Sequence, residues 1–253
     1  MKKILFLLSL VTMMAGMLAG CGTTTDSSQA YKGESPQKIY AYGRSALKDR
    51  SYSEAIKRFE ALDVQYPYGP ETEKAQFYLI YAYYMKDEYA LSAAAANRFI
   101  HLHPAYQYVD YAYYMRGLAN FYKNMGILER LFAVDLSTRD LTQIRKAYFD
   151  FRELVERFPN SVYAPPAHQY MVYLRNLMAS HILETAQFYY DRKAYVAAAN
   201  RANDVVAHYE GAPAVVDALV VMARSYHQLG MKKEEHDALQ VLKFNYPNKT
   251  VTM

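Results

Sequence analysis

The chain has 253 residues, of which 29 are lysine or arginine and 25 are aspartate or glutamate, for a formal net charge of +4. Without Lys2 and Lys3, 27 basic residues remain against the 25 acidic ones, so the charge balance does not indicate a nucleic-acid partner. The single cysteine, Cys21, excludes an internal disulfide. Tyrosine is abundant, with 27 residues, whereas tryptophan is absent.

Residues 1–20 have the pattern of a signal peptide. Lys2 and Lys3 precede an apolar run over residues 4–18, which is too short and wrongly flanked for a membrane-spanning helix. The run ends in Leu18-Ala19-Gly20-Cys21, which resembles the lipobox of bacterial lipoproteins. The alternative is a signal peptide followed by an incidental free thiol.

The lipobox resemblance implies that Cys21 carries an S-diacylglycerol and an N-acyl group, and we expect no other cofactor. Two or more acyl chains give stable anchoring, because each buried methylene contributes about 0.8 kcal/mol. Gly22, in place of aspartate, favours the outer membrane by resemblance to the lipoprotein sorting pattern. Thr23 to Lys32 form a polar, small-residue stretch, and we expect a flexible tether over residues 21–34.

A helical repeat accounts for most of the remaining chain. Tyr52, Ala55, Phe59, Leu62 and Tyr66 step by three and four residues, so they share one helix face, and Pro67 then stops the helix. This template fits four more times. The later copies run over residues 89–103, 144–158, 195–209 and 232–246. Each is followed by proline except the copy at 195–209, where Glu210 takes that place.

A second position, nine residues before each template, needs a small side chain where two antiparallel helices cross. Ile80 departs from this rule, and Gly117 is assigned across an insertion. The helix-turn-helix period resembles the tetratricopeptide repeat. We therefore predict an all-α tetratricopeptide-repeat solenoid of about five helix-turn-helix repeats. The crossing positions are Gly43, Ile80, Gly117, Ala186 and Ala223.

Residues 35–160 are expected to hold the first three repeats. The first helix should begin at Ser35-Pro36 and end at Lys48, where the turn at residues 49–51 follows. The third repeat carries an insertion at about residues 125–142 that is too apolar for a solvated loop. It could fold back on its own repeat, or it could form a projection that binds a partner.

Residues 161–247 are expected to hold repeats four and five, followed by a short tail at 248–253. No helix breaker stands between Pro166 and Arg192, so one helix of about 25 residues, roughly 38 Å long, should overhang its partner and join the two halves of the solenoid. Lys232 and Lys233 replace apolar anchors on the last helix, which suits a terminal repeat with one solvated face.

We find no catalytic or metal-binding constellation in the sequence. His101 and His103 lie two residues apart on a predicted helix and point to different faces, without cysteine or clustered carboxylates beside them. The sequence also lacks a glycine-rich phosphate loop and a Gly-x-Ser-x-Gly motif. We therefore expect a binding protein.

The first helices of a tetratricopeptide array line its concave side, which predicts an aromatic groove with a basic end. Tyrosine offers a large ring and one hydroxyl, and an arginine or lysine can receive a carboxylate. An extended peptide with aromatic or apolar residues and a free C-terminus would suit this groove. Packing between repeats is the alternative for any single tyrosine. The groove candidates are Tyr40, Arg44, Lys48, Phe77, Tyr81, Tyr84, Tyr111, Tyr114 and Tyr122.

The lipobox, the five repeats and the interrupted third repeat together resemble the BamD family of lipoproteins, which belongs to the outer-membrane β-barrel assembly machine. The resemblance extends from Cys21 to Pro247. Local sequences that carry it are Leu79-Ile80-Tyr81-Ala82-Tyr83-Tyr84, Tyr114-Met115-Arg116-Gly117-Leu118, Val134-Asp135 with Arg139-Asp140, Phe158-Pro159-Asn160-Ser161 and residues 196–201.

This resemblance implies a non-enzymatic scaffold on the periplasmic face of the outer membrane. Such a scaffold docks on the periplasmic domains of BamA, contacts the lipoproteins BamC and BamE, and receives unfolded outer-membrane proteins. The C-terminal repeats would hold BamA, with Asn200 and Arg201 at the contact. Another tetratricopeptide-repeat lipoprotein, such as a secretin pilotin or a coordinator of cell-wall synthesis, is the second hypothesis, and an enzyme is the third.

Overall fold

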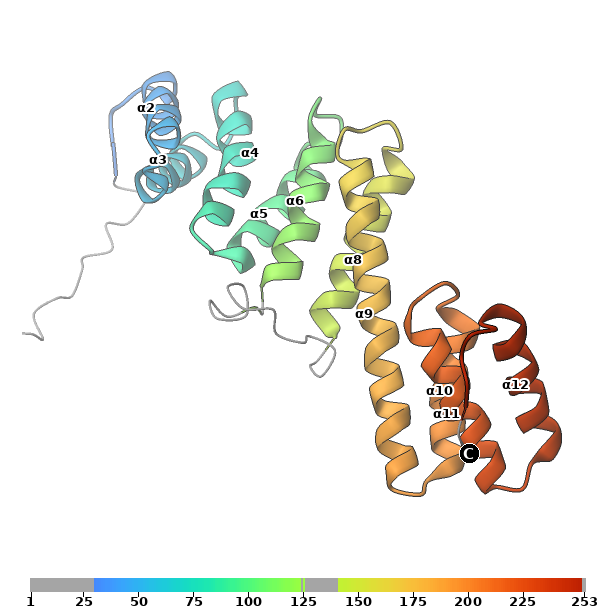
Figure 1. Cartoon of the computed structure of the whole chain (residues 1–253). Coiled ribbons are helices and arrows are strands. Elements are labelled where there is room, and N and C mark those ends of the chain that lie inside the picture. Colours follow the sequence, from blue (N-terminus) through green and yellow to red (C-terminus); the bar gives the residue numbers. More distant parts are fainter. Residues whose placement is uncertain (1–29, 124, 126–140, 252–253) are drawn as a thin grey trace, which may run out of the picture. The chain divides into compact units, whose positions relative to one another are not determined.

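The computed structural model describes residues 30–123, 125 and 141–251, and its regular elements are all α-helices (Figure 1). The predicted signal segment, Cys21 and residues 126–140 of the predicted insertion lie outside the described residues. The helices are α2 (Pro36–Lys48), α3 (Tyr52–Gln65), α4 (Pro70–Met85), α5 (Tyr89–Leu102), α6 (Val109–Tyr122), α8 (Thr142–Arg157), α9 (Ala164–Asp191), α10 (Tyr195–His208), α11 (Ala214–Gln228) and α12 (Lys232–Asn245).

These helices form consecutive antiparallel hairpins, as the repeat pattern predicts, and the all-α tetratricopeptide-like fold is confirmed. The chain divides into two compact units, one ending at Ala75 and one beginning at Gln76. The first unit holds α2, α3 and the start of α4. The second unit holds the remaining helices, in which each helix from α5 to α12 packs on the next one along the chain.

The first helix begins where its sequence signals predict. Ser35 is the N-cap, with its side-chain oxygen accepting a hydrogen bond from the backbone N–H of Lys38 at 3.3 Å, and Pro36 follows at the first helical position. Asp49 caps the other end of α2. The prediction of a flexible tether is wrong for its last five residues, 30–34, which are attached to the helical body. Ala30 is buried, and Tyr66 Oη donates a hydrogen bond to the carbonyl of Glu34 at 2.8 Å.

The second helix of each hairpin ends in the same conformation. The residue before each proline has φ from −130° to −135° and ψ from 56° to 70°, because proline keeps its predecessor out of the helical region. Tyr209 adopts a similar conformation without a following proline, and Gly211, at φ +78°, turns the chain there instead. The residues before proline are Tyr66, His103, Phe158 and Tyr246.

The predicted small residues at the helix crossings are all buried, and Ala186 and Ala223 have no exposed surface. At Gly117 the neighbouring helix comes so close that an added Cβ would lie 2.6 Å from a ring atom of Phe151. Ile80, the departure from the pattern, is also fully buried, and its carbonyl accepts a hydrogen bond from Ser92 at 2.8 Å. The predicted crossing positions therefore lie buried where paired helices approach each other.

The long helix α9 joins two hydrophobic cores within the second unit. It has 28 residues and packs on α8, α10 and α11. Ala167, Leu174 and Met178, from the first half and the middle of the helix, pack with residues of α6 and α8. Ala179 and Leu183 in its second half pack with residues of α10 and α11. The helix is slightly longer than the predicted 25 residues and packs with both cores, as expected of a helix that joins the two halves of the solenoid.

Candidate binding surfaces

Six half-buried tyrosines gather on the first helices of three successive hairpins, α4, α6 and α9. Tyr111 and Tyr114 lie three residues apart on α6, so both side chains leave the same face of that helix. Tyr163 is the N-cap residue of α9. We call this group the tyrosine cluster: Tyr84, Tyr111, Tyr114, Tyr122, Tyr163 and Tyr170.

Ring contacts connect the members of the cluster across helices. Tyr114 of α6 stacks on Tyr163, with ring centroids 5.2 Å apart and planes 22° apart. Tyr111 contacts the same ring at 5.5 Å. At the C-terminal end of α6, Tyr122 meets Tyr84 of α4 edge to face, with ring centroids 6.2 Å apart. The cluster therefore spans three helices that are far apart in the sequence.

The hydroxyl groups of Tyr84, Tyr111 and Tyr170 stay neutral at physiological pH. Burial, followed by the neighbouring tyrosines, raises the pKa of Tyr84, Tyr111 and Tyr170 above the ordinary value for tyrosine. A neutral phenol offers a donor, an acceptor and an aromatic face. The cluster can therefore bind aromatic or apolar side chains and hydrogen-bond to a peptide backbone.

The structure brings most of the predicted aromatic groove together. Tyr84, Tyr111 and Tyr114 belong to the cluster, and Tyr81 lies close enough to influence the ionisation of Tyr111. Phe77 lies 5.2 Å from Tyr111 and 5.5 Å from Phe99, between centroids, so it also packs between hairpins. Whether these side chains contact a substrate stays a prediction.

Sequence reasoning missed two members of the cluster. Tyr163 and Tyr170 lie seven residues apart at the start of α9, a spacing that places both on one helix face. Tyr170 also stacks on Phe151, with centroids 5.0 Å apart and planes 13° apart. The seven-residue spacing on a first helix is the signal that would have found them.

The predicted basic end of the groove lies in the first unit. Tyr40 Oη accepts a hydrogen bond from Arg44 at 3.2 Å, and Lys74 lies 5.9 Å from the Tyr40 ring centroid. Arg44 and Lys48 are exposed on α2. Their continuity with the tyrosine cluster stays a prediction.

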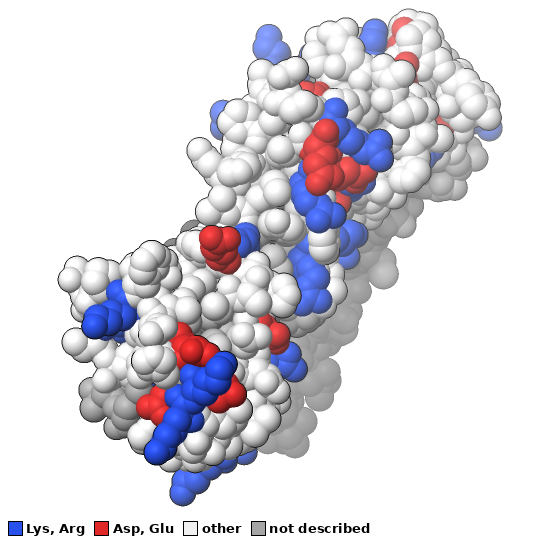
Figure 2. All heavy atoms as spheres, turned by 90° about the vertical axis from the view of Figure 1, so that its right-hand side faces the viewer, with Lys and Arg blue, Asp and Glu red and all other residues white. Residues whose placement is uncertain are grey.

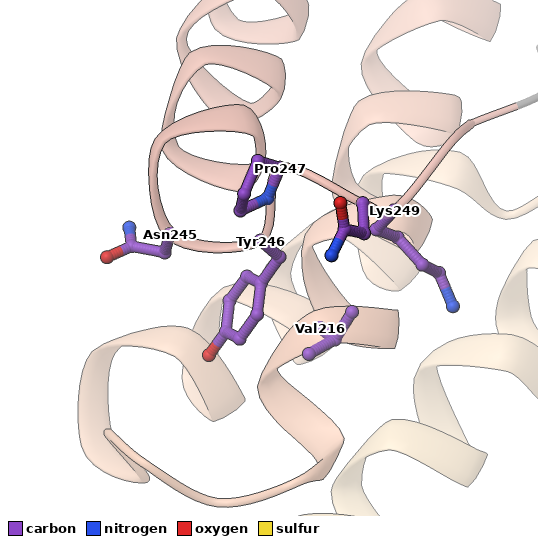
Figure 3. A pocket seen from close by; sticks show the side chains of 6 residues that line it. Val216, Asn245, Tyr246, Pro247 and Lys249 are labelled. Atoms are coloured by element: carbon purple, nitrogen blue, oxygen red, sulfur yellow. The ribbon is translucent and has the colours of Figure 1, made fainter.

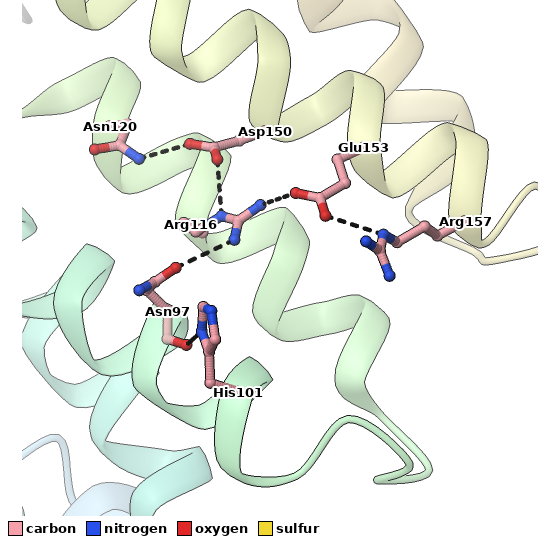
Figure 4. A network of polar contacts seen from close by, with 7 residues as sticks. All are labelled: Asn97, His101, Arg116, Asn120, Asp150, Glu153 and Arg157. Carbon is pink, nitrogen blue, oxygen red and sulfur yellow. Dashed lines mark hydrogen bonds and ion pairs between the residues drawn. The ribbon is translucent and has the colours of Figure 1, made fainter.

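A buried polar network fastens α6, the central helix of the cluster, to α8 (Figure 4). Arg116 is only 8% exposed, and its Nε lies 2.8 Å from Asp150 Oδ1 in an ion pair. A second ion pair joins Arg116 Nη2 to Glu153 Oε2 at 2.6 Å. Asn120 donates to the other oxygen of Asp150 at 2.6 Å. Because Arg116 is on the same helix as Tyr111 and Tyr114, this network helps to position them.

Asn200 and Arg201, the predicted partner-binding residues, are consecutive residues of α10, and both are exposed. Arg201 forms a surface ion pair with Asp204, with Nη1 and Oδ2 3.3 Å apart. Such an exposed pair contributes about 0–1 kcal/mol to stability. The guanidinium of Arg201 can therefore exchange this pair for one with a partner protein.

The last hairpin exposes apolar side chains that the sequence analysis did not single out. Phe244 on α12 is 87% exposed and Val241, three residues before it, is 44% exposed. The end of α12, the residues after it and the start of α11 also border a shallow pocket of about 410 Å³ (Figure 3). Its walls are formed by Val216, Asn245, Tyr246, Pro247, Asn248 and Lys249.

Charged side chains form no large single-sign patch on the face shown in Figure 2, where basic and acidic groups lie next to one another and uncharged areas separate them. Within the described ranges, His, Cys, Asp and Glu form no group of three or more that could hold a metal ion. In the same part of the chain, no helix combines the length and apolar character that crossing a membrane requires.

Comparison with known sequences gives consistent matches. The family model described as YfiO, outer membrane lipoprotein, matches residues 32–242. An outer membrane protein assembly factor BamD from Neisseria meningitidis is 36% identical over 247 residues, which cover 98% of this chain and 92% of the relative. The protein of the same name from Vibrio cholerae is 34% identical over 229 residues, covering 90% and 94%.

Among solved structures, a putative kinesin light chain with TPR-like repeats from Podosopora anserina matches 83% of this chain and 95% of its own length. Its TM-score is 0.42 and its sequence identity is 12%. At this level of similarity the match supports no inference about the protein.

Proposed function

The chain belongs to the YfiO, or BamD, family of outer-membrane lipoproteins, and we propose that it is a lipid-anchored periplasmic scaffold of the machinery that assembles β-barrel proteins in the outer membrane. The scaffold binds unfolded barrel precursors and docks on BamA. It also contacts BamC and BamE. The scaffold catalyses no reaction, and its covalently attached group is the lipid on Cys21.

The tyrosine cluster is the observation that carries the proposed substrate binding. Strands of outer-membrane β-barrels alternate apolar and polar residues and carry aromatic residues near both membrane interfaces. An unfolded strand needs partners for its rings and for its backbone groups. Stacked rings such as Tyr114 and Tyr163, with neutral hydroxyls beside them, offer both kinds of partner.

Binding of peptides from barrel precursors tests this proposal. Replacing Tyr81 and Tyr84 by alanine, or Tyr114 alone, should weaken the binding of an aromatic-rich strand peptide about tenfold, because truncation removes ring contacts at the site. Replacement by phenylalanine keeps the rings and should cost less. Fluorescence anisotropy measures the affinity, and circular dichroism measures the helix content of each variant.

Tyr68, which is 92% exposed, offers the matched control, since its replacement by alanine should change neither property. Unchanged affinity in the alanine variants, with helix content intact, would exclude the cluster as the substrate site. A loss of helix content would instead assign those tyrosines to packing between hairpins, and the phenylalanine variants then decide whether the hydroxyls bind the peptide.

The basic end of the predicted groove is tested with two versions of one peptide. A peptide with a free C-terminal carboxylate should bind more tightly than its amidated form if Arg44 and Lys48 receive the carboxylate. Replacing both residues by glutamine should then abolish the difference. If the two peptides bind the original protein equally well, these residues have no role in recognising a C-terminus.

The exposed surface of the last two hairpins supports the proposed docking of BamA. Arg201 offers a cation there, and Phe244 offers an exposed ring. Exposed aromatic and arginine side chains are enriched at protein interfaces, where they supply much of the binding free energy. We place BamA at these hairpins, which leaves the tyrosine cluster available for the substrate.

A further inference from the structure

The residues that precede the first helix are folded onto α3. Ala30 is 6% exposed, and its carbonyl accepts a hydrogen bond from the side chain of Gln65. Tyr66 Oη donates to the carbonyl of Glu34 at 2.8 Å. Between these two points the backbone N–H of Glu34 donates to the carbonyl of Tyr31 at 3.0 Å and closes a turn. We call Ala30–Glu34 the N-terminal strap.

The side chain of Tyr31 clamps the strap in place. Its ring lies over the guanidinium of Arg58, with 4.2 Å between the ring centroid and the guanidinium carbon. The ring centroid of Tyr42 lies 5.0 Å from the same carbon. The Tyr31 hydroxyl donates to Glu54 Oε1 at 2.8 Å, and Arg58 Nε lies 2.7 Å from that oxygen. Tyr31, Arg58 and Glu54 therefore each contact the other two.

The environment of the Tyr31 hydroxyl agrees with a folded strap. Burial and the hydrogen bond to Glu54 raise the pKa of Tyr31 to about 12. A phenol on a solvated tether would keep its ordinary pKa near 10. The polar and small residues of the tether gave no sign of this attachment, because its partners lie on α3.

The strap shortens the chain that links Cys21 to the helical body. From Cys21 to Ala30 the backbone has nine peptide steps, which span at most about 32 Å when fully extended. If the strap were released, the link would reach Ser35 and span about 50 Å. The contacts of Tyr31 therefore decide how far the first hairpin can move from an anchor at Cys21.

We infer that the N-terminal strap, clamped by Tyr31 between Arg58 and Glu54, is a positioning device that holds the first hairpin close to the membrane. Its significance for membrane distance rests on the proposed lipid anchor at Cys21. The clamp itself does not depend on that anchor. Loss of the clamp lengthens the tether by five residues while leaving the helices in place.

Limited digestion with trypsin tests the clamp. Lys32 is the first lysine or arginine after Cys21, and it lies inside the strap. Cleavage after Lys32 requires the strap to open, because a protease needs an unfolded segment. In the full chain reconstituted into vesicles, Tyr31→Ala should speed the appearance of fragments beginning at Gly33 about tenfold, since cleavage follows the population of the open form.

Two variants complete the digestion experiment. Tyr31→Phe keeps the ring over Arg58 but loses the hydrogen bond to Glu54. Its cleavage rate should therefore lie between those of the unaltered protein and Tyr31→Ala. Tyr68→Ala, at a fully exposed tyrosine of the same unit, should leave the rate unchanged. Equal rates for the unaltered protein and Tyr31→Ala would overturn the clamp. Mass spectrometry identifies the fragments whether or not the protein is attached to the vesicles, so failure of the anchor is recognised separately.

Energy transfer to the bilayer tests the positioning role. A fluorophore on Ser53→Cys, an exposed site on α3, reports distance to acceptors in the lipid headgroups of the vesicles. Tyr31→Ala should reduce the transfer. Inserting five glycine and serine residues between Thr25 and Asp26 should reduce it similarly with the strap intact. If the insertion reduces transfer and Tyr31→Ala does not, the strap does not control membrane distance.

Discussion

Gly43 of α2 lies directly against the ring of Phe59 on α3, so that a Cβ at this position would stand 2.5 Å from Phe59 Cε1. Gly117 and Phe151 repeat the relationship in the third hairpin, at 2.6 Å. Both phenylalanines are fully buried. The large ring of one helix and the missing side chain of the other thus set how closely the paired helices approach.

Gly43→Ala should therefore destabilise the protein. Alanine gains about 1 kcal/mol of helix propensity over glycine, but the extra methyl group overpacks the crossing and costs roughly 1–3 kcal/mol. A lower free energy of unfolding in urea, followed by circular dichroism, is the expected result. Ser45→Ala, at an exposed position of the same helix, is the control. A stabilised Gly43→Ala variant would show that α2 moves away from Phe59 without cost.

The helices could be predicted because local sequence patterns mark their buried faces and their ends. The period of three and four residues marks the buried face, and the proline after Tyr66 or Phe158 fixes the helix end through backbone sterics. Ser35 and Pro36 mark the first helix start in the same way. These signals act within a few residues, so one sequence is enough to read them.

The polar network and the strap could not be predicted, because their partners are distant in the sequence. Arg116 and Asp150 are polar residues on amphipathic helices, and polarity alone indicates solvent. Only the crossing of α6 and α8 buries them together. Tyr31 likewise stands in a polar segment, and nothing near it in the sequence reveals Arg58 as its partner. Phe244 was missed for the opposite reason, since apolar residues on a helix usually indicate a core.

Arg116→Met should cost about 3–5 kcal/mol of stability at pH 7, because it leaves the carboxylate of Asp150 buried without its cation. The double variant with Asp150→Asn removes the charge as well and should recover part of this loss. Urea unfolding of the single and double variants measures both effects. If the single variant is as stable as the original protein, Asp150 gains access to water or to another cation when Arg116 is removed.

The cost of Arg116→Met should also depend on pH. Burial raises the pKa of Asp150, against the opposing effects of Arg116 and Asn120. A folded-state pKa above the unfolded one means that the stability contributed by this group is complete below the ordinary pKa, near 4, and is lost as pH rises through the folded value. Without Arg116 the pKa rises further.

The destabilisation by Arg116→Met should accordingly be smaller at pH 4 than at pH 7, and the double variant with Asp150→Asn should show no such difference. Comparing the free energies of unfolding at the two pH values removes the contribution of other groups that titrate equally in all proteins of the set. The same cost at both pH values would mean that Asp150 is not the group left uncompensated.

Cys21→Ser tests the proposed lipid anchor. The helical body begins well after this residue, so the variant should keep its helix content but no longer sediment with outer membranes. In the unaltered protein, the mass of the tryptic peptide ending at Lys32 should include the diacylglycerol and the N-acyl group. Sedimentation of Cys21→Ser with outer membranes at the original level would contradict anchoring through this cysteine.

Arg201→Glu should weaken the binding of BamA periplasmic domains at least about tenfold, because a desolvated ion pair loses one partner and gains a repulsive charge. Arg201 is 54% exposed in its surface pair with Asp204, so the free energy of unfolding should change by less than about 0.5 kcal/mol. Arg145→Glu makes the same charge change at an exposed site on α8 and should leave the affinity intact. Surface plasmon resonance with immobilised BamA domains measures all three proteins. Equal affinities would remove Arg201 from the interface, whereas a loss in both variants would indicate that net charge, and not a specific pair, governs docking.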